Sequence, residues 1–97
     1  MARALFLLVF FSSALIGQAA QADCYADYKA KQDDPLRLHY GVMTVEAMPC
    51  VSSPEIDADV SRRLEDAGWI LLQIESVFEG AALETKKADA GEFFLRF

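Results

Sequence analysis

The side chains that could serve catalysis in this sequence are one histidine, two cysteines and many carboxylates. His39 is the single histidine of the chain. A hydrolytic triad needs a histidine that is oriented by a carboxylate and bonded to a nucleophile, and no motif around His39 supplies that set. We therefore interpret His39 as a partly exposed strand residue and predict no catalytic residue. A small enzyme that uses His39 and a carboxylate is the alternative.

Paired carboxylates occur in the middle of the chain, for example Asp57 with Asp59 and Glu65 with Asp66. They fall on the polar side of an amphipathic segment, which indicates a solvated face. Their spacing differs from that of a calcium-binding loop. The five glycines are scattered and form no phosphate-binding loop. We therefore predict no metal site and no cofactor.

Cys24 and Cys50 are the two cysteines, so one intramolecular disulfide is available. A redox pair usually has a Cys-x-x-Cys spacing. A zinc site that included His39 would lack an obvious fourth ligand. The sequence therefore predicts a structural disulfide, which should stabilise so small a domain by about 3 to 4 kcal/mol in the chain-entropy model.

The first 22 residues have the three parts of a secretory signal peptide. Arg3 gives a basic start, residues 4–16 carry no charge, and Ala20-Gln21-Ala22 provides an Ala-x-Ala cleavage signal. A membrane-spanning helix needs about 20 apolar residues, which favours cleavage over an uncleaved anchor. We predict a signal peptide over 1–22 and a single small exported domain over 23–97, in the periplasm or outside the cell.

The composition is acidic, with a formal net charge of −6 that becomes more negative when Arg3 is removed with the leader. Binding to nucleic acid or to an anionic lipid surface requires clustered Lys and Arg. The charge therefore argues against both, and it remains compatible with a basic protein partner.

The elements that must position these residues begin with a strand over residues 36–46, where apolar and polar residues alternate. A helix follows from Pro54, with Ser52 or Ser53 as its cap. Its apolar residues Ile56, Val60 and Leu64 recur every four positions, and Gly68 ends it.

A second strand over residues 69–78 should place Ile70 and Leu72 on one face and Trp69 and Leu71 on the other. If the chain reverses at both ends of the helix, the two strands run parallel in a right-handed crossover.

Three further segments complete the predicted fold. Residues 23–32 contain Ala, Lys and Gln and are interpreted as a short helix or an ordered arm. Residues 79–91 favour a short helix that Gly91 closes, with a hairpin as the alternative, and residues 92–97 alternate like a last strand. The fold class is α+β, with a mixed three-stranded sheet in β-α-β-β order and one main amphipathic helix.

Three stretches resemble small secreted bacterial proteins of unknown function, in which a helix runs through Gly-Trp into an apolar strand. The matching stretches are residues 67–72 (AGWILL), 91–97 (GEFFLRF) and 23–28 (DCYADY). The resemblance implies a small exported α+β domain. It transfers no functional residue, because that family has no assigned activity.

A three-stranded sheet with one helix covers one face well, so an apolar patch is expected on the other face. We predict that Trp69, Leu71 and Phe94, with Val77, form this patch and bind a protein partner. The rival interpretation is that the disulfide-held N-terminal arm covers them. The sequence thus predicts a non-enzymatic, exported protein-interaction module, with binding of an envelope glycan or small ligand as the alternative.

Overall fold

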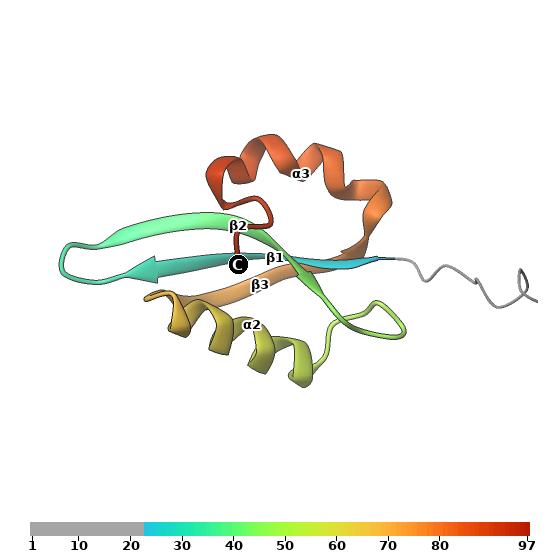
Figure 1. Cartoon of the computed structure of the whole chain (residues 1–97), viewed down its shortest axis with the longest axis horizontal. Helices are drawn as coiled ribbons and strands as arrows, with labels where there is room; N and C mark the ends of the chain where they lie inside the picture. The colour runs from blue at the N-terminus through green and yellow to red at the C-terminus, as the bar shows by residue number, and fades with distance from the viewer. Residues whose placement is uncertain (1–22) are drawn as a thin grey trace, which may run out of the picture.

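The computed structural model describes residues 23–97, so the predicted signal peptide over residues 1–22 lies outside the described residues. One three-stranded sheet lies between two helices, one on each face (Figure 1). The elements are β1 (Cys24–Gln32), β2 (Arg37–Val45), α2 (Pro54–Asp66), β3 (Ile70–Glu79) and α3 (Leu83–Ala90). The predicted α+β class, the three-stranded sheet and the main amphipathic helix are confirmed.

The strand order in the sheet is β2-β1-β3, and both outer strands pair with β1 in antiparallel orientation. β2 and β3 therefore run parallel to each other, as predicted for the strands before and after the helix, but β1 lies between them. The prediction of a mixed sheet was wrong in this respect, because both hydrogen-bonded strand pairs are antiparallel.

Residues 23–32 form the central strand β1, so the prediction of a short helix or ordered arm was wrong. Alternate residues of β1, namely Ala26, Tyr28 and Ala30, are buried against α2. Pairing along both edges and burial of these side chains outweigh the helix propensity of Ala, Lys and Gln, which is a weak preference.

Tyr28 is fully buried and lies across Gly41, its cross-strand partner on β2. A Cβ atom at position 41 would lie 2.6 Å from Cζ of Tyr28 and even closer to its hydroxyl oxygen. Glycine is therefore required there so that the ring can pack flat against the strand.

Replacing Gly41 with alanine is expected to lower the free energy of unfolding by about 1 to 3 kcal/mol, because the tyrosine ring must move out of a packed core. Urea unfolding of residues 23–97 measures the loss. Gly80→Ala is the matched control, since its added Cβ would lie 3.8 Å from the nearest side chain. An equal loss in both variants would show that the effect is not specific to Tyr28.

The helix α2 follows the sequence signals closely. Of the two candidate caps, Ser53 is the one used: its Oγ accepts a hydrogen bond from the amide of Ile56 at 3.2 Å. The stripe of Ile56, Val60 and Leu64 is buried as predicted. At the other end Gly68 has φ +87°, and the Trp69 amide donates to the Leu64 carbonyl at 2.8 Å, which forms a Schellman motif.

The segment after β3 forms a short 3₁₀ turn, η2 (Gly80–Ala82), and then α3, so the helix prediction for this region is confirmed. Gly91, with φ +56°, ends α3. The predicted last strand over residues 92–97 is wrong. A 3₁₀ turn, η3 (Gly91–Phe93), is followed by a single parallel bridge between Phe94 and Val42.

Residues 91–97 cross the outer edge of β2, and we call them the C-terminal clamp. The amide of Leu95 donates to the carbonyl of Val42 at 2.8 Å. Leu95 then adopts φ +55°, outside the extended region, so the chain leaves the sheet edge after one bridge. Within the clamp, Phe93 and Phe97 pack on the α2 side of the sheet and Phe94 on the α3 side, whereas Leu95 is exposed.

Cys24 and Cys50 form the predicted disulfide, with their Cα atoms 5.6 Å apart. The bond ties the start of the central strand to the connector before α2. The connector itself carries no strand or helix between Val45 and Pro54, so the disulfide cross-links an irregular segment to the central strand.

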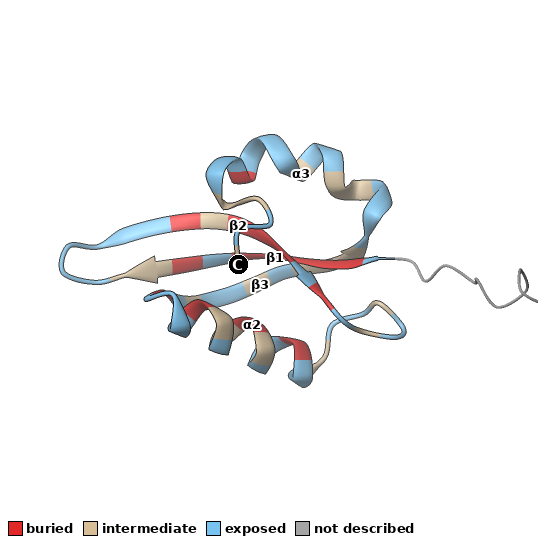
Figure 2. Ribbon diagram, in the orientation of Figure 1, coloured by how far each residue is buried: buried red, intermediate tan, exposed pale blue. Residues whose placement is uncertain are grey.

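Two hydrophobic clusters lie on the two faces of the sheet. Figure 2 marks the buried positions along the strands, along α2 and near the end of α3. The larger cluster packs under α2. The smaller one lies under α3 and consists of Tyr25, Val42 and Ala90, with half-buried Tyr40, Phe78, Leu83 and Phe94 around it. The second face is therefore covered in part by α3, and not by an N-terminal arm.

Candidate binding surface

The three residues predicted to bind a partner do not form one exposed patch. Trp69 is only 7% exposed and belongs to the larger cluster, against which half-buried Leu71 packs. Phe94 is half-buried on the opposite face. The sequence pattern did not show which face of β3 would meet α2, so the two faces were interchanged. Trp69 and Leu71 are therefore packed against the core.

His39 lies buried in a group of aromatic rings. Its imidazole stacks on Phe93, with ring centroids 3.7 Å apart and planes inclined by 12°. Trp69 meets it edge to face at 4.2 Å. Nε2 lies 2.9 Å from the hydroxyl of Tyr28, while Nδ1 is buried and has no hydrogen-bond partner among residues 23–97.

Burial lowers the pKa of His39 to about 4, and the positive charge of Arg96 acts in the same direction, against the opposing effect of Glu92. Burial also raises the pKa of Tyr28 to about 12. A neutral, enclosed imidazole that is paired with a neutral phenol has the features of a structural histidine. This environment gives no support to a general base at His39.

A second buried polar group lies beneath α3. Asp27 of β1 accepts hydrogen bonds from Ser76 at 2.5 Å and from Tyr40 at 2.7 Å, and Nζ of Lys86 on α3 lies 2.9 Å from the same carboxylate. Burial by itself would raise the pKa of Asp27. The three donors outweigh that effect and hold the pKa below its ordinary value. The group fastens α3 to all three strands.

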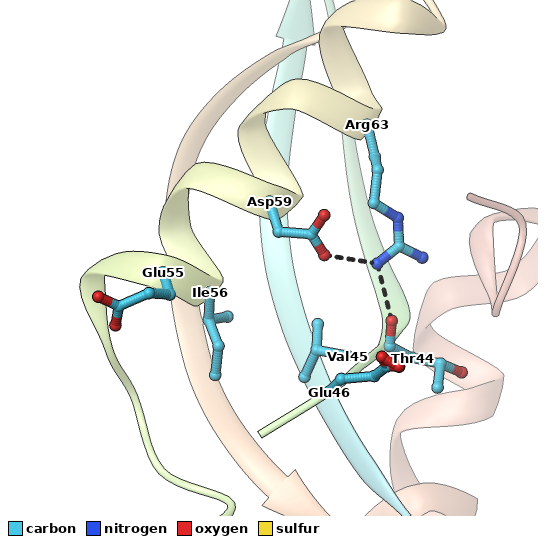
Figure 3. Close-up of a pocket in the computed structure, with 7 residues that line it drawn as sticks. All are labelled: Thr44, Val45, Glu46, Glu55, Ile56, Asp59 and Arg63. Atoms are coloured by element: carbon cyan, nitrogen blue, oxygen red, sulfur yellow. Dashed lines mark hydrogen bonds and ion pairs between the residues drawn. The ribbon is translucent and has the colours of Figure 1, made fainter. Parts of the chain in front are cut away.

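A surface groove of about 410 Å³ lies between α2 and the end of β2 (Figure 3). Its lining includes three carboxylates, on Glu46, Glu55 and Asp59. Figure 3 shows that the guanidinium of Arg63 points into the groove and bonds to Asp59 at 3.0 Å and to the carbonyl of Thr44 at 2.9 Å. Arg63, held by Asp59 of the same helix, thus joins α2 to β2 through the Thr44 carbonyl.

Exposed apolar side chains gather at the far end of the β1–β2 hairpin, which extends beyond both helices in Figure 1. Leu38 and Ile70 both pair with Lys31, one from each side, so the three form one row across the sheet. We define the hairpin-end patch as Leu36, Leu38, Ile70 and Leu72; these side chains are 64%, 65%, 45% and 50% exposed.

A hollow of about 330 Å³ adjoins this patch. It lies among Leu38 and Tyr40 of β2, Lys29 of β1 and Leu72 of β3. Lys29, two residues before Lys31 on β1, pairs with Tyr40, and this pair lies on the same face of the sheet as Lys31 and Leu38. The hairpin-end patch therefore continues the face that α3 covers, over the half that α3 leaves open.

The outer edge of β3 is a less suitable binding site than this face. Two register shifts interrupt its pairing with β1, and they leave Leu72 and Glu75 as the extra residues of two bulges. Bulges twist an edge strand and disfavour the addition of another strand. The bulge at Leu72 also explains why simple alternation would place Ile74 with Ile70, although Ile74 packs with Leu71 on the α2 side.

No protein-family model, curated protein or solved structure matches this chain. Within residues 23–97, neither helix has the length and apolar character to cross a membrane. The same residues contain no group of three histidine, cysteine or acidic side chains arranged to hold a metal ion.

Proposed function

We propose that this chain is an exported, non-enzymatic interaction module that binds another protein through the hairpin-end patch. The observation that carries the proposal is the exposure of Leu38, Ile70 and Leu72 on one uncovered half of a sheet face. Exposed apolar side chains that cluster in this way mark binding surfaces, whereas single exposed leucines do not.

The occupant we expect is a short apolar segment of a protein. Lys31 lies between Leu38 and Ile70 in the cross-strand row, and Lys29 lines the adjoining hollow. Both ammonium groups already have weak intramolecular partners, at 3.4 Å to Asp33 and 3.9 Å to Glu75. A partner carboxylate beside the apolar segment would compete for these lysines, which favours an apolar segment with acidic flanks.

Export is part of the proposal and is supported by two features. The disulfide between Cys24 and Cys50 is suited to a compartment outside the reducing cytosol. The leader over residues 1–22 has the composition of a signal peptide. The resemblance to small secreted bacterial proteins agrees with both.

The alternative, binding of an envelope glycan, has less support. Sugar rings stack on exposed aromatic faces, but Trp69, Tyr25 and Tyr28 are buried. The strongly exposed large apolar residues between positions 23 and 97 are aliphatic or methionine: Leu36, Leu38, Met48, Val51, Ile70, Leu72 and Leu95.

The test is a crosslinked pull-down from envelope extract with tagged residues 23–97 in the oxidised form. We expect the wild-type protein to capture a partner at near-equal stoichiometry. Replacing both Leu38 and Leu72 with serine should reduce the amount captured by about tenfold or more, because two leucine contacts are removed. The matched control replaces Met48 and Val51 with serine. These two side chains are about as exposed as Leu38 and Leu72, but they lie in the connector near the disulfide.

The control variant should capture the partner as well as the wild-type protein does. Undiminished capture by Leu38→Ser/Leu72→Ser would contradict the assignment of the patch. Failure to recover any specific protein, together with sedimentation on purified cell wall, would support the glycan alternative instead.

A further inference from the structure

The C-terminal clamp is held to the rest of the molecule by polar contacts and by aromatic packing, and its two rings on the α2 side, Phe93 and Phe97, pack on His39. On the polar side there are the Phe94–Val42 bridge with its Leu95 hydrogen bond, and a 2.8 Å hydrogen bond from Arg63 of α2 to the carbonyl of Phe97. On the apolar side, Phe93 stacks on the imidazole at 3.7 Å and Phe97 lies 6.0 Å from it.

This enclosure suits an uncharged imidazole. One ring nitrogen of His39 faces the Tyr28 hydroxyl, and the other, Nδ1, is buried without a partner among the described residues. Protonation makes both nitrogens donors. The added charge would then be desolvated, and one N–H would lack an acceptor, which is costly in a protein interior.

Other charged groups around His39 do not relieve this cost. Arg96 of the clamp lies over the rings of Phe93 and Phe97, at 5.6 and 5.9 Å, and adds positive charge to the same region. Glu92 opposes it but also forms a long 3.9 Å ion pair with Arg96. From the other elements, β1 presents Tyr28, and α2 presents Arg63 at the end of the clamp.

We propose that residues 91–97 are an acid-released clamp on the outer edge of β2, in which protonation of His39 opens the stack that holds Phe93 and Phe97. Water reaches Nδ1 once the clamp lifts, so the open state accepts the proton more readily than the closed state does. Opening also uncovers the β2 edge at Val42 and the ring faces of Trp69 and His39.

The expected size of the effect follows from linkage. An exposed histidine has a pKa near 6.5, whereas enclosure lowers that of His39 to about 4. The ratio of open to closed clamp should therefore rise as the pH falls from about 6.5 to 4, by at most about 300-fold. Above pH 6.5 the clamp stays closed, because the imidazole is neutral in both states.

Nuclear magnetic resonance of residues 23–97 tests this directly. His39 is the single histidine, so its ring C–H signals report its titration without a variant. Hydrogen exchange of the Leu95 amide, which bonds to Val42 in the closed clamp, reports opening. We expect the Leu95 protection factor to fall by up to about 300-fold, starting near pH 6.5 and levelling off at the pH where the His39 ring signals titrate. The amides of the paired residues Tyr28 and Gly41 in β1 and β2 should keep their protection.

Two variants separate the effect of His39 from that of the Glu92 carboxylate in the clamp. His39→Gln should make the Leu95 protection independent of pH between 7 and 4, and Glu92→Gln should keep the transition. Constant protection in the wild-type protein would overturn the proposal, as would an unchanged transition in His39→Gln. If His39→Gln leaves the clamp open at every pH, the decision rests on whether wild-type protection starts to fall near pH 6.5 and levels off where His39 titrates; a fall over another pH range would overturn the proposal.

Discussion

Replacing Asp27 with alanine is expected to lower the free energy of unfolding by about 3 kcal/mol, a large part of the stability of so small a domain. The variant leaves the ammonium of Lys86 and the hydroxyls of Tyr40 and Ser76 without their acceptor at a buried position. Urea unfolding at pH 7 measures the loss. Because Lys86 crosses from α3, the helix should also lose amide protection before the strands do.

The control for Asp27 is Glu75→Ala, which removes a carboxylate from an exposed pair with Lys29 at 3.9 Å. That loss should be below about 1 kcal/mol. Equal effects in the two variants would show that burial of the Asp27 group adds nothing.

The Asp27 group also predicts a pH dependence. Its pKa is below the ordinary value of 3.8 in the folded state, so the stabilisation is complete above pH 3.8 and is lost as the pH falls through the lower, folded-state value. Asp27→Asn should abolish this part of the acid dependence. The pH range in which Asp27 loses its stabilising effect lies below the interval from pH 6.5 to 4 in which protonation of His39 opens the clamp. One pH titration can therefore separate the two effects.

Removing the disulfide is the second change with a large expected effect. Cys24 and Cys50 are 26 positions apart, and opening a loop of that size should cost about 3 to 4 kcal/mol. The melting temperature of Cys24→Ala/Cys50→Ala should fall by about 15 °C or more. Calorimetry or circular dichroism of residues 23–97 measures the change.

Reduced wild-type protein is the control, because it keeps both sulfur atoms in place while breaking the bond. It should lose nearly as much stability as the double variant. If reduction leaves the melting temperature unchanged, the connector before α2 is held by packing alone, and the structural role assigned to the disulfide is incorrect.

The parts of the fold that local signals determine were predicted well. Ser53, Pro54 and Gly68 mark the ends of α2, and its buried stripe follows from a four-residue period. Gly91 closes α3 in the same way. These features depend on hydrogen bonds between residues close in sequence, so the sequence around them is sufficient.

Apart from the disulfide, which follows from there being two cysteines, features that depend on distant partners were not predicted. β1 contains helix-forming residues, and it is a strand because β2 and β3 pair with both of its edges. The Asp27 group draws its donors from positions 40, 76 and 86, which no spacing rule connects. The hairpin-end patch was missed because alternation groups Ile70 with Leu72 but does not show which face of β3 meets α2.

The position of β1 has a consequence for the order in which the chain can fold. The central strand comes first in the described sequence, and its two neighbours become available at very different times. Pairing with β2 closes a short turn and is fast, whereas pairing with β3 must wait until residues 70–79 have arrived through α2. During that interval one edge of β1 is unpaired and open to strands of other molecules. Formation of the Cys24–Cys50 disulfide by an oxidant outside the reducing cytosol needs no residue of β3, so the covalent link can form early and shorten the search that completes the sheet.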